Sequence, residues 1–365
     1  MSEQGPGRPP TWPGLTEADA LDEIVPRLTG ADGPADESGA WPERLWKILE
    51  DAGAPRWPLP LAVGGAGLDR ASAVRRYGRI AEGSLTAAFL LTQHDAATRR
   101  LTAPNAGAKA TAWLPRIASA DAFATVGISQ LTTSRRRGPA ALVARPYGEG
   151  FELEGALPWV TAADRADVIV AGAVLEDGRQ VLVALPTDRP GVTVHEPFAL
   201  AALQASRTTE VLIEGCTVEP DEVIAGPVAD VMSLPGVAGT GGLETSALAL
   251  GQARAALVAL ANEPRDDLSE PVDALSSEWG ELARDLIAAA DGDPNAPAPP
   301  AIRARANTLV LRATQAHLTA RKGSGFLMTD PAQRWARQAL FFLVWSCPSP
   351  VATAALRGFA GLCPT

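Results

Sequence analysis

One segment in the middle of the chain reads Gly155-Ala-Leu-Pro-Trp-Val-Thr-Ala-Ala-Asp-Arg-Ala-Asp167. Short runs rich in β-branched residues lie on both sides of it, separated by Gly, Pro and Asp, and this texture is typical of strands. The runs cover residues 123–128, 141–144, 151–160, 167–174, 180–185 and 209–213. Their spacing predicts an all-β domain of about one hundred residues.

Helical patterns flank this β-region on both sides. Apolar residues recur at helical spacing from residue 17 to about residue 119, and helical periodicity resumes near residue 243. We therefore expect an α+β chain. Its parts are a flexible Gly- and Pro-rich arm (1–14), an N-terminal α-helical domain (15–120), a middle β-domain (121–228) and a C-terminal α-helical domain (229–365).

Composition excludes several classes of function. The 365-residue chain carries a formal net charge of -10, which argues against binding to nucleic acid, because that interaction needs clustered Lys and Arg. The chain has no apolar run of membrane-spanning length and no secretory signal pattern, so we expect a cytoplasmic protein without a membrane partner. Its three Cys and three His are scattered, and this spacing predicts no metal site.

Four motifs resemble those of the acyl-CoA dehydrogenase family and follow one another in the family's order. The 155–167 segment is similar to the family's G-x-K-x-W-I-T-N-x-x-x-A-D. The other three are Leu59-Pro60 with Gly64-Gly-Ala-Gly67, the segment 205–220 that resembles a strand closing the β-domain, and Gly323-Ser-Gly325-Phe followed by Pro331, Arg334 and Arg337. The resemblance implies a three-part fold: an N-terminal helical domain, a middle β-barrel domain and a C-terminal helical bundle.

The resemblance also implies an FAD cofactor and residues that hold it. Trp159 takes the position of the family's Trp beside the flavin ring, and Thr161 that of the residue that bonds near the reactive flavin nitrogen. Backbone amides at Gly323 and Gly325 match a turn that contacts the cofactor pyrophosphate.

Two further cofactor positions depart from the family pattern. Ser129 is the first residue of the segment that stands in place of the family's T-E-P-x-A-G-S-D motif. Arg265 matches the Arg of the family's R-x-x-F-G motif, whose other residues are not found here. We expect both positions to lie at the flavin site, with a reduced affinity for FAD. Arginines 135–137 next to Ser129 are a second phosphate-binding possibility, weighed against a solvated basic loop.

The family's catalytic glutamate is not found at its usual position. Alignment places Ser346 there, and a serine hydroxyl without a base beside it has too high a pKa to remove a proton. Some family members place the glutamate at the start of the C-terminal helical domain, and Glu244 lies about one turn from that position. The alternative interpretation of Glu244 is an acid favoured by the dipole of its helix.

These features predict an FAD-dependent oxidoreductase with non-standard acid–base residues, Ser346 and Glu244 being the catalytic candidates. The resemblance implies a small-molecule substrate of the acyl thioester class, and a homo-oligomer, dimer or tetramer, or a homologous subunit as partner. Two alternatives stay open. One is a flavin-dependent monooxygenase of the same fold, and the other is a catalytically degenerate scaffold that pairs with an active homologue.

Overall fold

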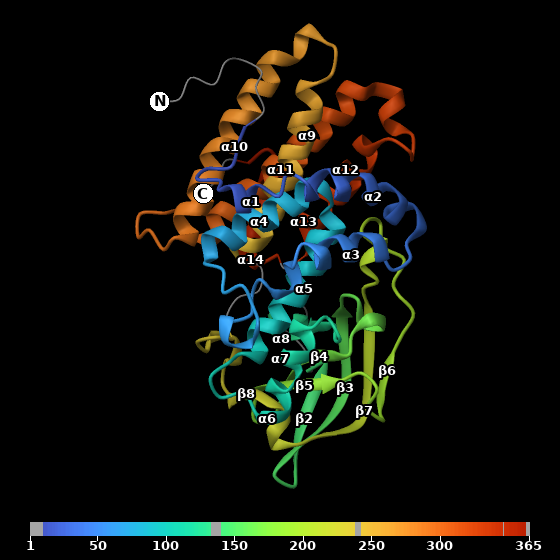
Figure 1. Ribbon diagram of the computed structural model, residues 1–365, viewed down its shortest axis with the longest axis vertical. Helices are drawn as coiled ribbons and strands as arrows, with labels where there is room; N and C mark the ends of the chain where they lie inside the picture. Colours follow the sequence, from blue (N-terminus) through green and yellow to red (C-terminus); the bar gives the residue numbers. More distant parts are fainter. Residues whose placement is uncertain (1–9, 133–139, 238–241, 346, 363–365) are drawn as a thin grey trace.

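The computed structural model describes residues 10–132, 140–237, 242–345 and 347–362. Ser346 therefore lies outside the described residues. The described chain confirms the expected order of helices, then a β-sheet domain, then helices. In Figure 1 most helices of both terminal regions gather at one end of the molecule, and the strands lie at the other end together with α6 and α7. The helix α5 lies between the two ends.

The N-terminal helices differ in length: α5 is the longest of those described, and the short helices α6 and α7 lie between it and the first strand. They are α1 (Glu17–Ala20), α2 (Ile24–Ser38), α3 (Glu43–Asp51), α4 (Arg70–Gly83), α5 (Leu85–Leu101), α6 (Ala108–Thr111) and α7 (Trp113–Ala118). Ser84 alone connects α4 to α5 and caps both helices. Its backbone N–H donates to the Ile80 carbonyl at the end of α4, and its hydroxyl accepts from the N–H of Ala87 at the start of α5. This turn fixes the angle between the two helices.

The middle region forms one mixed sheet of eight described strands. They are β1 (Ala124–Gly127), β2 (Leu142–Tyr147), β3 (Gly150–Val160), β4 (Val168–Val174), β5 (Gln180–Pro186), β6 (Val192–Val194), β7 (Thr209–Val218) and β8 (Val223–Val228), with the one-turn helix α8 (Ser129–Thr132) after β1. The hydrogen-bonded order is β6-β7-β3-β2-β4-β5-β8, and β1 pairs with β4 in parallel.

The strand β4 is apolar at nearly every position because both of its faces are buried. Ile169, Ala171 and Ala173 pack into the larger apolar core, which is shared with the helices, while Val168 and Val170 face a second, smaller core. A strand covered on both faces has no polar alternation, which explains its continuous apolar sequence.

The C-terminal helices are α9 (Leu243–Ala261), α10 (Ser269–Ala290), α11 (Pro299–Arg321), α12 (Pro331–Ala339), α13 (Phe341–Val344) and α14 (Ser349–Phe359). The sequence predicts one last helix from residue 332 to about 345, whereas the structure ends α12 at Ala339, begins α13 at Phe341 and adds α14. Among the described residues, no helix combines the length and apolar character needed to cross a membrane.

A close contact between α4 and α9 joins the two helical regions. A Cβ atom on Gly251 would lie 2.1 Å from the carbonyl oxygen of Gly78, so only glycine at 251 allows the backbones to approach this closely. The contact sets α4 beside the N-terminal part of α9. The side chains of these two helices therefore face one common space, which is the cavity described next.

Candidate functional site

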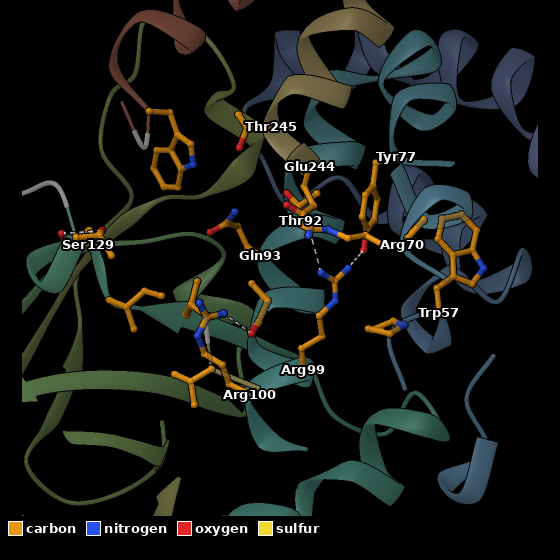
Figure 2. Close-up of a pocket in the computed structure, with 18 of the residues that line it drawn as sticks. Trp57, Arg70, Tyr77, Thr92, Gln93, Arg99, Arg100, Ser129, Glu244 and Thr245 are labelled. Atoms are coloured by element: carbon orange, nitrogen blue, oxygen red, sulfur yellow. Dashed lines mark hydrogen bonds and ion pairs between the residues drawn. The ribbon is translucent and has the colours of Figure 1, made fainter. Parts of the chain in front are cut away.

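A cavity of about 740 Å³ lies between the helices and the sheet domain. Side chains of α4, α5 and α9 form one wall, and the other wall comes from β1, α8 and β3 (Figure 2). Val344 and Trp345 also line it, so the residues that directly precede position 346 belong to this cavity.

The sheet wall presents Ser129 and Trp159, both of which the sequence predicts at a flavin site. The Ser129 hydroxyl is buried and has no hydrogen-bond partner within the described ranges. The Trp159 indole is 40% exposed and packs edge-on against Phe198 at a ring-centroid distance of 5.0 Å. A buried hydroxyl without a partner and an open aromatic face fit a planar heteroaromatic ligand that has hydrogen-bonding groups at its edge.

The glycine that begins the 155–167 segment has a structural role. Gly155 has a φ of +128°, and a Cβ atom there would lie 2.2 Å from the Ala141 carbonyl oxygen. A side chain at this position would separate β3 from β2. Gly155 therefore positions the strand that carries Trp159 into the cavity.

Thr161 is buried beside the cavity and is not among the residues that line it. Its hydroxyl lies 3.2 Å from the Thr208 hydroxyl, and its backbone carbonyl accepts a hydrogen bond from the Thr125 hydroxyl at 2.8 Å. A direct bond from this hydroxyl to a flavin therefore stays a prediction.

The helical wall carries most of the charge. Arg70 and Tyr77 come from α4, Arg99 and Arg100 from α5, and Glu244 from the first turn of α9. Figure 2 shows Tyr77, Arg99 and Glu244 grouped at this wall. Burial lowers the pKa of Arg100 to about 10, so it remains a cation at neutral pH.

Arg99 is the centre of a hydrogen-bonded network. Its Nη1 lies 3.1 Å from Glu244 Oε1, and its Nη2 donates to the Tyr77 hydroxyl at 2.7 Å. The Tyr77 hydroxyl in turn donates to a carboxylate oxygen of Asp95, which is fully buried behind the cavity wall. The network therefore holds both terminal nitrogens of the Arg99 guanidinium, whose side chain lines the cavity.

Asp95 and its neighbour His94 are both fully buried, and burial shifts their pKa values in opposite directions. Burial lowers the pKa of His94 from 6.5 to about 4 and raises that of Asp95 from 3.8 to about 7, because it disfavours each charged form. As the pH falls from 6.5 to 4, the unfolded chain protonates His94 and the folded chain does not, which costs about 3 kcal/mol of stability. Asp95 has the opposite effect on stability. As the pH falls from 7 toward 3.8, Asp95 becomes protonated in the folded chain, the cost of burying its charge disappears, and the free energy of unfolding rises.

We expect Asp95→Asn and His94→Gln to give stability profiles of opposite sign. Between about pH 7 and about pH 4.5, Asp95→Asn should lose about 3 kcal/mol relative to the parent chain, because only the His94 effect is left. His94→Gln should gain stability over the same range. Urea titrations at the two pH values measure both, and parallel profiles for the two variants would contradict the assignment.

The structure places the predicted residues in two groups. Ser129, Trp159 and Glu244 line the cavity, whereas Arg265, Gly323 and Gly325 do not. Arg265 Nη1 donates to the Ala320 carbonyl at 3.4 Å, just before the turn that holds the two glycines, and the Arg265 side chain also pairs with Asp267.

Sequence reasoning found Glu244 on the helical wall but missed its arginines and Tyr77. Arg70, Ala73 and Tyr77 recur at helical spacing on one face of α4, and Ala96, Arg99 and Arg100 do so on α5. Polar residues at such spacing within an otherwise apolar helix indicate a face turned toward a cavity. The described residues contain no group of three or more His, Cys, Asp or Glu that could hold a metal ion.

Comparison with known proteins places these features in context. No protein-family model matches the chain. A probable acyl-CoA dehydrogenase of Bacillus subtilis is 27% identical over 275 residues, which is 72% of this chain and 70% of that protein. Benzylmalonyl-CoA dehydrogenase of Aromatoleum aromaticum is 26% identical, over 64% of this chain and 63% of that protein. L-evernosamine nitrososynthase of a Micromonospora species is 27% identical, over 60% of this chain and 54% of that protein. The chain thus spans less than two thirds of the length of the last two relatives.

Solved structures share the fold over nearly the whole chain. A glutaryl-coenzyme A dehydrogenase in complex with glutaryl-CoA superposes with a TM-score of 0.79 at 18% identity, covering 95% of this chain and 96% of that one. A nitrososynthase from Micromonospora carbonacea var. africana gives 0.76 at 21% identity, covering 97% and 98%. These structures show that the chain has the acyl-CoA dehydrogenase-like fold, with N-terminal helices, a central β-sheet domain and C-terminal helices, and its sequence is distantly similar to acyl-CoA dehydrogenases.

Proposed function

We propose that this chain is an FAD-dependent oxidoreductase that acts on a small acyl thioester. One observation carries the proposal: a single cavity combines Ser129 and Trp159 on its sheet wall with the Glu244 carboxylate on its helical wall. The similar proteins support it, since three of the five compared above are named as dehydrogenases of CoA thioesters. A further solved structure of this fold, a glutaryl-CoA dehydrogenase from Mycobacterium smegmatis, is a complex with FADH2.

The sheet wall is the part of the cavity that fits the flavin ring. Trp159 offers an open aromatic face, and Ser129 offers a hydroxyl without a partner among the described residues, with Thr161 buried beside them. Bound FAD would accept a hydride from the substrate carbon next to the one that loses a proton, so that a carbon–carbon double bond forms.

The helical wall supplies the group that takes the proton. Glu244 is the only carboxylate among the described residues that line the cavity, so we assign the general base to it. Its carboxylate pairs with Arg99 at 3.1 Å and is about one quarter exposed. To receive a proton, Glu244 must give up part of this pairing when substrate binds.

Homo-oligomerisation belongs to the same proposal. Arg265, Gly323 and Gly325 do not line the cavity of their own chain, yet they occupy positions that the family uses for the cofactor. We therefore assign them to the phosphate end of FAD held by a neighbouring copy. Measuring the molar mass of the FAD-loaded protein by light scattering tests this, and a monomer with bound FAD would contradict it.

Replacement of Trp159 by Ala should weaken the retention of FAD. The variant loses the aromatic face that we assign to the flavin ring, and a loss of about tenfold in affinity is expected from one stacking contact. Flavin absorption of the purified protein, followed during dialysis, measures it. Trp113→Ala serves as the control, because Trp113 is a partly buried indole outside the cavity lining. An unchanged spectrum and affinity in Trp159→Ala would contradict the flavin site.

A flavin-dependent monooxygenase is the second candidate. The similarity to a nitrososynthase supports it, as does the pairing of Glu244 with Arg99, which occupies the carboxylate. Oxygen consumption by the chemically reduced, FAD-loaded protein, measured with and without an organic substrate, distinguishes the candidates. Substrate-dependent oxygen incorporation favours the monooxygenase, and protein that binds no FAD at all favours the scaffold.

A further inference from the structure

We infer that the helical wall of the cavity binds a carboxylate of the substrate between Arg99 and Arg70, in the place now taken by Glu244. The inference rests on the proposed function and adds a substrate class to it: thioesters whose acyl group ends in a second, negatively charged carboxylate.

The first support is the charge of the cavity. Its described lining contains three arginines, Arg70, Arg99 and Arg100, against one carboxylate, Glu244. The chain as a whole has the opposite balance, with a net charge of -10. A cavity with excess positive charge in an acidic protein favours an anionic ligand, because a partly enclosed site strengthens the attraction.

The second support is the way Arg99 is held. Tyr77 accepts a hydrogen bond from Nη2, and Asp95 holds the Tyr77 hydroxyl from behind. The guanidinium is therefore oriented before any ligand arrives. An oriented guanidinium fork suits a carboxylate, and little side-chain freedom is lost when the carboxylate binds.

The third support is the position of Arg70. Its side chain lines the cavity and has no hydrogen bond or ion pair within the part of the chain that the structure describes. Arg70 and Glu244 both approach Gly242. A Cβ atom built on Gly242 would lie 3.9 Å from Arg70 Nη2 and 3.0 Å from Glu244 Oε2. Arg70 thus lies near the Glu244 carboxylate that pairs with Arg99, and Figure 2 shows the three side chains at the same wall of the cavity.

These positions define an exchange of partners. A ligand carboxylate that enters between Arg70 and Arg99 takes the bond that Glu244 now makes to Arg99 Nη1. Glu244 is then released toward the substrate, where it acts as the base. Substrates without the second carboxylate do not displace Glu244, so the Arg99–Glu244 ion pair stays intact.

The test compares two thioesters of N-acetylcysteamine, which carry no phosphate. The glutaryl thioester has a terminal carboxylate, and the pentanoyl thioester has a methyl group in its place. Calorimetric titration of the purified protein should give a dissociation constant about 10- to 100-fold lower for glutaryl, the range for a charge-assisted pair. Equal dissociation constants for the two probes in the parent protein would overturn the inference.

Variants then assign the preference to residues. Arg70→Gln and Arg99→Lys should each remove most of the glutaryl preference, so that the two probes bind with similar dissociation constants. Arg305→Gln is the matched control, because this arginine lies on α11 outside the cavity and pairs with Asp285. A preference that survives in both cavity variants contradicts the assignment. If Arg70→Gln weakens binding of coenzyme A but not of the glutaryl probe, the arginines bind phosphate and the carboxylate assignment is wrong.

Glu244→Gln gives a readout that a purely structural ion pair would not. With the competing carboxylate removed, the glutaryl probe should bind about tenfold more tightly, and the ratio of the pentanoyl to the glutaryl dissociation constant should rise. Weaker binding of glutaryl in this variant contradicts the exchange.

Flavin absorption and a melting curve for each variant separate this inference from the proposed function. A glutaryl preference in protein that never binds FAD would defeat the proposed function alone. Flavin-loaded protein without the preference would defeat the inference alone.

Discussion

Replacing Glu244 by Gln is expected to lower the turnover of an acyl thioester about a hundredfold to ten-thousandfold, the usual contribution of a general base. The amide keeps the shape of the side chain and still accepts a hydrogen bond from Arg99, but it has no basic oxygen to take the proton. Steady-state reduction of a dye acceptor by the FAD-loaded variant measures the loss. The flavin spectrum should stay that of the parent protein, because Glu244 belongs to the opposite wall of the cavity.

Glu278→Gln is the matched control for this measurement. Glu278 also pairs with an arginine, Arg312, but it lies on α10 and does not line the cavity. Its turnover should equal that of the parent. If Glu244→Gln keeps more than about half of the parent turnover, the base lies elsewhere and our assignment of Glu244 is wrong.

Replacing Trp279 by Ala is expected to lower the free energy of unfolding by about 3–5 kcal/mol, the range for removing a buried aromatic side chain. Trp279 is fully buried on α10, where its Nε1 donates to the Leu250 carbonyl at 2.8 Å. Its ring meets that of Trp12 edge-on at 5.0 Å. The variant loses the packing and the hydrogen bond from the Trp279 side chain to the Leu250 carbonyl.

Denaturant titrations of parent and variant measure this change. Phe359→Ala is the control, because this aromatic side chain on α14 is 67% exposed and should change stability by less than about 0.5 kcal/mol. A loss below about 1 kcal/mol in Trp279→Ala would show that α9 and α10 repack around the gap.

The order of the domains could be predicted because local sequence carries it. Strand runs and helical spacing are short-range patterns, and the 155–167 segment reads correctly as the end of a strand, since β3 ends at Val160. The helix boundaries near the C-terminus could not be predicted in this way. Residues 331–345 keep one helical pattern, yet the structure breaks it between Ala339 and Phe341.

The candidate site could be predicted only where a motif marks it. Ser129 and Trp159 were found by their neighbours in the sequence. The network around Arg99 was not, because Tyr77 and Glu244 lie 22 and 145 residues from it and meet it only through the packing of three helices. No local sequence pattern predicts contacts between residues so far apart in the chain. Charged residues on one side of a helix also predict a solvent-exposed face, unless the structure shows that this side lines a cavity.

Three of the nine tryptophans, Trp57, Trp159 and Trp345, line the cavity. Indole emission depends on the polarity around the ring and is quenched by an acceptor that absorbs near it. The protein therefore contains its own optical reporter: a ligand that enters between the walls will change the intrinsic fluorescence without any added dye. A screen of small anionic compounds can begin with that signal alone.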